Sequence, residues 1–175
     1  IPLIVRDPRV EADGTRGQVV GDLTENIDLM PTILDWLGVD EFPLQCDGRS
    51  LLPFLTTGGA PREWRTEAHW EFDFRNPWDV EGMGRRGFRM DQCVLAVARS
   101  DRHKLVVFPT LPPVLYDLDE DPAELHDRAG DPAAAPLLLE HTQRMLAWRM
   151  VNTERLLTGT MLGSWGVKVA NDRLR

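Results

Sequence analysis

The chain has 175 residues, enough for one to two domains, and its 42% hydrophobic content is ordinary for a globular protein. A formal net charge of −8 disfavours nucleic acid and anionic lipid as partners. No apolar run approaches the roughly 18–20 residues that span a bilayer, and no signal peptide is recognisable, so we expect a cytoplasmic protein without a membrane partner.

The first predicted elements belong to an α/β domain. Residues 1–5 (IPLIV) form a continuous apolar run, which is typical of a strand buried on both faces of a parallel sheet. Apolar residues at helical spacing predict a helix over 28–37, with Pro31 in its first turn, and a shorter helical turn is expected within 47–55. One strand and one helix cannot close an α/β domain, so we interpret residues 1–60 as the last part of a larger parallel sheet.

The second predicted region, residues 61–157, is a small antiparallel sheet with one long helix. Strands are expected at about 65–74, 93–98, 103–108 and 113–118, because these runs are apolar and their last three are joined by short turns. Residues 76–92 have no clean period and are predicted to be a loop, whereas a helix is predicted from 133 to about 157. The tail, 158–175, carries apolar groups that need cover, and we expect it to contact a second copy in a homo-oligomer.

One stretch, HWEFDFR (69–75), has the composition of a site. On a strand it places His69, Glu71, Asp73 and Arg75 on one face and three aromatic residues on the other. A histidine with two carboxylates is a set that holds a divalent metal or performs acid–base catalysis, and His103 is the histidine companion in the same region. The same alternation is typical of any half-exposed strand. We favour that interpretation, with the aromatic face inward and the polar face outward.

Complete catalytic motifs are absent from the sequence. It contains no GxSxG and no HExxH, and the glycines of EGMGRRG (81–87) neither follow a predicted strand nor precede a predicted helix. The acidic run 117–124 lacks the spacing of a calcium-binding loop. Cys46 and Cys93 have no CxxC spacing and are expected to be reduced thiols. We therefore assign no catalytic and no metal-ligating residue to this chain.

Four blocks in order nevertheless resemble a known family. They are IPLIVRDP (1–8), NIDLMPTILDWLG (26–38), DGRSLLPFL (47–55) and RSDRHKLVVF…VLYDLDEDPAELHDRAGDP (99–132). Together they resemble the C-terminal third of the sulfatase family, within the alkaline-phosphatase-like superfamily, over about residues 1–150. HWEFDFR and the tail segment VNTERLLTG look most like the phosphonate monoester hydrolase and phosphodiesterase branch.

The resemblance implies a fold and a chemistry. The fold is α/β: the end of a doubly wound alkaline-phosphatase-like sheet, followed by a small α+β domain of antiparallel sheet and long helix. Family catalysis uses a formylglycine, made in a Cys/Ser-x-Pro-x-Arg motif, and a divalent metal (Ca, Mn, Mg or Zn) to hydrolyse a sulfate, phosphate or phosphonate ester. Neither cysteine heads such a motif, so the catalytic groups are expected upstream of Ile1 and the chain is expected to be inactive alone.

The resemblance leaves two residues and two alternatives to consider. If this chain touches the small anionic ester, His69 and Arg75 are the candidates at the rim, since both donate hydrogen bonds to anionic oxygens. One alternative is a non-catalytic, dimerising interaction module from a truncated gene. The other, less favoured, is an independent metallohydrolase that uses His69, Glu71, Asp73 and His103.

Overall fold

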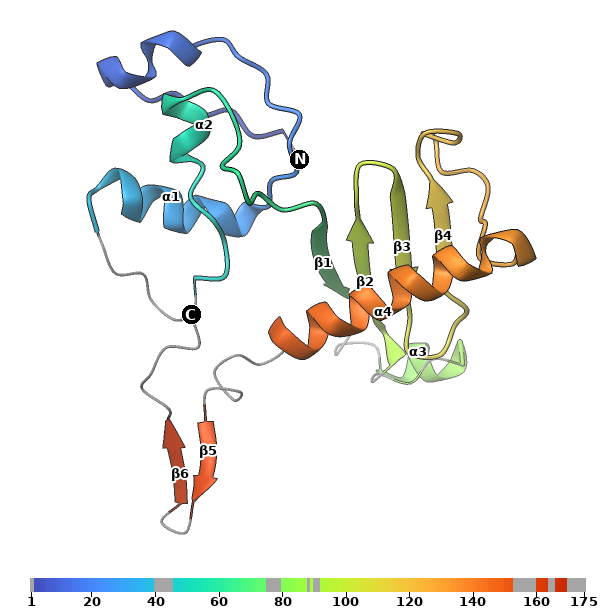
Figure 1. Ribbon diagram of the computed structural model, residues 1–175. Helices are drawn as coiled ribbons and strands as arrows, with labels where there is room; N and C mark the ends of the chain where they lie inside the picture. The colour runs from blue at the N-terminus through green and yellow to red at the C-terminus, as the bar shows by residue number, and fades with distance from the viewer. Residues whose placement is uncertain are drawn as a thin grey trace. The chain divides into compact units, whose positions relative to one another are not determined.

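The computed structural model describes residues 2–39, 46–74, 80–87, 89 and 92–152, and the backbone of two strands at 160–163 and 166–169. The chain divides into two compact units, Ile1–Trp64 with Trp148–Arg175 and Arg65–Ala147 (Figure 1). None of the described helices is both long and apolar enough to cross a membrane.

The first unit contains short helices and a hairpin. Its elements are the 3₁₀ helices η1 (Val10–Thr15) and η2 (Asn26–Asp28), the helices α1 (Leu29–Trp36) and α2 (Leu52–Thr56), and the paired strands β5 (Thr160–Gly163) and β6 (Gly166–Val169). The predicted helix 28–37 is thus confirmed as α1. A capping box at Glu25 and Asp28 starts η2, which runs directly into α1, and Gly38, with φ of 75°, follows the end of α1.

Two of the sequence blocks in this unit bind each other. The carboxylate of Asp28 is fully buried and accepts the backbone N–H of Glu25 at 2.7 Å and that of Arg49 at 2.8 Å. Thr32 donates its hydroxyl to the carbonyl of Asp28 at 2.5 Å and accepts the N–H of Leu51 at 2.8 Å. Side chains of the Asp-x-x-Pro-Thr helix therefore hold the Asp-Gly-x-Ser-Leu segment by accepting its backbone N–H groups, so both motifs are structural here.

The strand expected over residues 1–5 is not formed. Residues 2–8 have no regular secondary structure, and Ile4 is 93% exposed. A strand is stable only when neighbouring strands complete its hydrogen-bond ladder, and no described strand pairs with this segment. The assignment of residues 1–60 to the end of a larger sheet stays a prediction.

The second unit is an antiparallel meander with one long helix, as predicted. Its strands follow one another in the sheet in chain order: β1 (Ala68–Asp73), β2 (Val94–Arg99), β3 (His103–Val107) and β4 (Val114–Asp117). The helix α4 (Ala135–Asn152) follows the 3₁₀ helix η4 (Pro132–Ala134), which Asp131 caps by accepting the N–H of Ala133. Part of the loop predicted at 76–92 is instead a short helix, α3 (Val80–Arg85), built across two glycines.

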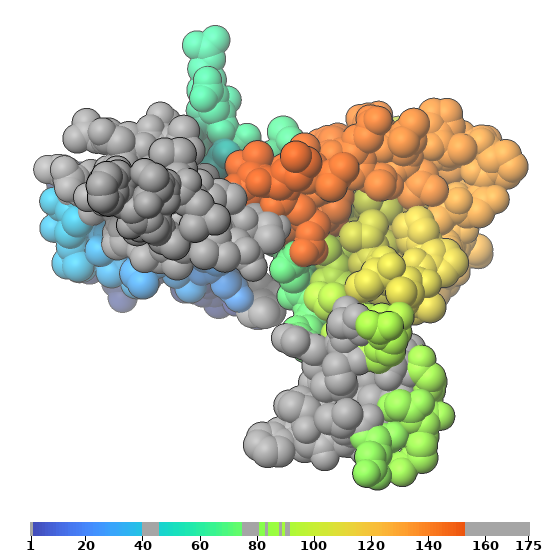
Figure 2. All heavy atoms as spheres, turned by 90° about the horizontal axis from the view of Figure 1, so that it is seen from below, coloured from blue at the N-terminus to red at the C-terminus, as the bar shows by residue number. Residues whose placement is uncertain are grey.

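The helix α4 covers one face of this sheet (Figures 1 and 2). The register aligns His69, Ala98, Leu105 and Leu115 across the four strands on one face. Small residues on β2 let the helix approach, and the centre of the face is apolar, since Leu105 and Leu115 are fully buried. Burial of this apolar area stabilises the unit.

Candidate functional site

Polar residues from β1 and α4 surround one carboxylate, that of Glu67. Glu67 lies just before β1, and its side chain is almost completely buried. Its Oε1 atom is 2.9 Å from Nη2 of Arg144 and 3.6 Å from Nδ1 of His141, both on α4. Its Oε2 atom is 3.7 Å from Nε2 of His69 on β1. A single carboxylate thus connects the edge strand of the sheet to the helix above it.

Further polar groups continue the row toward β4. The rings of His141 and His103 lie edge to face, with centroids 5.1 Å apart. Nε2 of His103 is 3.8 Å from a carboxylate oxygen of Asp117, and that oxygen accepts a hydrogen bond from Nη2 of Arg102 at 3.0 Å. We call the set Arg144, Glu67, His69, His141, His103, Asp117 and Arg102 the polar row.

Burial controls the protonation of its centre. Burial lowers the pKa of His69 to about 4, and the charges of Arg144 and Arg65 act in the same direction. The pKa of His141 is also lowered, first by burial and then by His103 and Arg144. Burial raises the pKa of Glu67, although Arg144 partly opposes this effect. Both imidazoles are therefore neutral at pH 7, and the positive charge beside Glu67 comes from Arg144.

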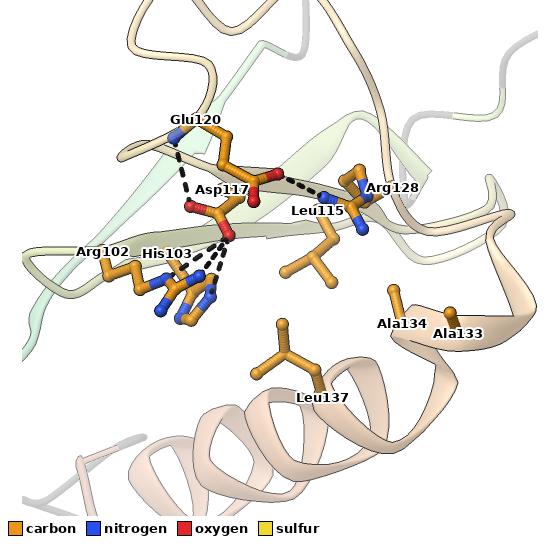
Figure 3. A pocket seen from close by; sticks show the side chains of 9 residues that line it. All are labelled: Arg102, His103, Leu115, Asp117, Glu120, Arg128, Ala133, Ala134 and Leu137. Atoms are coloured by element: carbon orange, nitrogen blue, oxygen red, sulfur yellow. Dashed lines mark hydrogen bonds and ion pairs between the residues drawn. The ribbon is translucent and has the colours of Figure 1, made fainter.

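A hollow of about 340 Å³ lies at the far end of the polar row, between β4 and the start of α4 (Figure 3). Leu115 and Leu137 face each other across it. Its lining consists of Arg102, His103, Leu115, Asp117, Glu120, Arg128, Ala133, Ala134 and Leu137. The size and the mixed lining are those of a small-ligand cavity.

The charges around this hollow are already paired. Arg102 binds Asp117, which lowers the pKa of that carboxyl, and its Nε also lies 3.6 Å from Asp119. Arg128 pairs with Glu120 at 3.0 Å and with Asp131 at 3.2 Å. Four carboxylates thus surround two guanidinium groups, and the hollow offers no surplus positive charge to an anionic ester. These contacts fix the turn after β4 and make it structural.

The buried face of β1 is the opposite of the one predicted from the sequence. The aromatic face was predicted to point inward, but Trp70 and Phe72 are 42% and 59% exposed. His69 lies on the buried face, because the small side chain of its partner Ala98 leaves room and α4 supplies polar partners there. This prediction was wrong in its choice of face.

The remaining candidates do not assemble into a reactive site. Glu71 and Asp73 are exposed, and Arg75 lies outside the described residues. Within the described part of the chain, no group of three or more His, Cys, Asp or Glu side chains has the geometry to hold a metal ion. The metal set of His69, Glu71, Asp73 and His103 therefore has no geometric support.

Sequence reasoning missed the residues that surround His69 at the centre of the polar row. Glu67, His141 and Arg144 were not singled out as site residues, although Glu67 is two residues before His69 and the other two are separated by three positions on α4. Those spacings place each pair on one face of its element. The signal was present locally, but nothing in the sequence showed that the two faces meet.

Comparison with known proteins finds a family model and a curated relative that each match most of this chain. The family model described as N-sulphoglucosamine sulphohydrolase, C-terminal, matches residues 1–151. The multifunctional alkaline phosphatase superfamily protein PehA of Trinickia caryophylli is 42% identical over 171 residues, which cover 98% of this chain and 32% of that protein.

Two solved structures are similar in both sequence and fold. The phosphonate monoester hydrolase of Agrobacterium radiobacter is 40% identical, with a TM-score of 0.68 over 81% of this chain and 28% of that one. The enzyme SpPMH of Silicibacter pomeroyi is also 40% identical, with a TM-score of 0.69 over 83% of this chain and 29% of that one. The chain spans about a third of the length of these relatives.

Proposed function

Because the chain belongs to the N-sulphoglucosamine sulphohydrolase C-terminal family, and so is the C-terminal region of a sulfatase-like hydrolase of the alkaline-phosphatase-like superfamily, we propose that it serves the hydrolysis of small phosphonate or phosphate esters. The observation that carries this choice is the 40% identity to two phosphonate monoester hydrolases over four fifths of the chain. Sulfate esters are the second candidate substrate, from the description of the matching family model.

In this proposal the chain supplies architecture, and the chemistry resides elsewhere in the enzyme. The described residues do not fit the divalent metal that the family implies, and neither Cys46 nor Cys93 lies in a Cys-x-Pro-x-Arg motif. We therefore assign no catalytic step to this chain. His69 is no longer a candidate at the substrate rim, since its ring is buried beside Glu67, whereas Arg75 remains one.

The first unit gives physical support for a preceding polypeptide. Several of its large apolar side chains are more than half exposed: Ile4, Val10, Val19, Ile27, Met30, Ile33 and Leu37. Exposed apolar patches of this kind mark surfaces that another part of a protein covers. We propose that the missing cover is the rest of a large α/β domain, to which residues 1–5 add a strand.

A chimera tests this proposal. The pure chain is expected to hydrolyse neither aryl phosphonates, phosphodiesters nor aryl sulfates. The chimera joins this chain to the N-terminal part of the Agrobacterium radiobacter enzyme, which is the part that has no counterpart in this chain. It is expected to show metal-dependent turnover of phosphonate monoesters. The control is that N-terminal part alone. Turnover by the pure chain would refute the architectural role, and a folded chimera without turnover would refute the proposal that this chain completes a phosphonate monoester hydrolase.

We also propose that the protein is a homo-oligomer and that it remains cytoplasmic without nucleic-acid or membrane partners. The support for self-association is the hairpin β5–β6, which pairs with no other described strand. A lone two-stranded hairpin is marginally stable in water. A dimerising module without any enzymatic role is the alternative, and inactivity of the folded chimera would favour it.

A further inference from the structure

Glu67 is the point where the sheet and α4 are held together by charge. Its nearly buried carboxylate lies within 4 Å of groups from both elements: His69 on β1, and His141 and Arg144 on α4. His141 is also buried, and Met145, one turn further along the helix, is 2% exposed. Titratable groups in such a contact make its strength depend on pH.

Charged and titratable groups face these imidazoles from both the sheet and the helix. On the sheet side, Glu67 and Arg65 lie near His69, and β2 places Ala98 opposite it. His103 lies beside His141 and is itself close to Asp117. From the helix, the groups are Arg144 and Glu140, which pair with each other at 3.6 Å. Arg144 lies nearest to Glu67 and already neutralises it, so a proton added to either ring is a second positive charge in a buried space.

We propose that the packing of α4 on the sheet is a proton-sensitive contact, which is closed while the rings of His69 and His141 are neutral and loosens when acid protonates them. The device lies wholly within Arg65–Ala147. It is independent of the proposed esterase function and would operate in the chain alone.

The sign of the effect follows from the direction of each shift. Burial lowers the pKa of His69 from 6.5 to about 4. Between these two pH values, the His69 ring is protonated in the unfolded chain but neutral in the folded form. Stability is complete above about pH 6.5 and is lost as the pH falls toward 4. His141 acts in the same direction. Glu67, with a raised pKa, favours the folded form in acid, but one carboxyl opposes two imidazoles.

The test is chemical unfolding of the full chain at about pH 7 and about pH 5, with His69→Gln, His141→Gln and the control His126→Gln, whose ring is 78% exposed. For the wild type, the unfolding equilibrium constant of the sheet unit should rise by up to about tenfold per pH unit for each histidine. The first two substitutions should flatten that dependence, and the control should leave it unchanged. Wild-type pH dependence in both buried-site variants would overturn the proposal.

Hydrogen exchange locates the change and does not need folded variants. All four histidines lie in the second unit, so α1 in the first unit is an internal reference. After correction for intrinsic exchange rates, amides of α4 near His141 should lose protection between about pH 7 and about pH 5, while those of α1 should not. Equal loss in both helices, or protonation of the His69 and His141 rings with α4 fully protected, contradicts the proposal.

Discussion

At the scale of single residues, Gly48 shows how the two motifs of the first unit constrain the sequence. A Cβ atom at this position would lie 2.8 Å from the backbone nitrogen of Asp28 and closer still to the carbonyl group of Ile27. Since these atoms belong to a backbone that hydrogen bonds already fix, they cannot move away at low cost. Gly48→Ala is therefore expected to destabilise the first unit by about 1–3 kcal/mol, measured by urea unfolding.

The matched control is Gly59→Ala. A Cβ at Gly59 would meet no atom within 4 Å, and this glycine does not have a positive φ. The substitution is expected to be neutral or slightly stabilising, because it reduces the entropy of the unfolded chain. Equal effects of the two substitutions would show that Asp28 does not hold the Gly48 segment as described.

At the scale of elements, the packing of α4 depends on a small number of inward side chains. Met145 is 2% exposed, whereas Met150 on the same helix is 70% exposed. Met145→Ala should lower the free energy of unfolding by about 2–5 kcal/mol, because it leaves a cavity between helix and sheet. Met150→Ala, the control, should change it by less than about 0.5 kcal/mol. Calorimetry or urea unfolding measures both, and similar losses at the two positions would contradict the observed helix face.

At the scale of the whole molecule, the first unit contains few buried apolar residues and many exposed ones. Its buried apolar side chains among the described residues are Ala12, Pro31, Leu51 and Phe54, whereas Ile4 and Val19 are more than 90% exposed. Such a surface favours association. Light scattering of the pure chain is expected to give a mass above the 19.9 kDa of one copy.

Removal of the residues after Asn152 separates two sources of that association. If the hairpin β5–β6 supplies the contact, the shortened chain should be monomeric or markedly weaker in self-association. If the exposed residues of the first unit supply it, the mass should not change. A monomer of the full chain at tens of micromolar would contradict the homo-oligomer altogether.

The sequence predicted the elements whose signals are local. The strands β2, β3 and β4 were predictable because apolar runs and short turns determine an antiparallel meander without help from distant residues. The helix α1 was predictable from its caps and its apolar period. The strand predicted at residues 1–5 is not formed, because pairing partners decide whether a strand forms. The short helix α3 was missed, because Gly82 and Gly84 argue against a helix.

What the sequence determined by itself about this protein is its family, its meander and its long helix, since each depends on residues close together in the chain. Only the tertiary structure decided which face of β1 is buried. Alternation distinguishes two faces of a strand, but the inner one is chosen by what packs on it. Here Arg144 and His141 on α4 contact the buried carboxylate of Glu67 next to β1. They lie more than 70 residues beyond Glu67 in the chain, so the sequence around β1 does not show this contact.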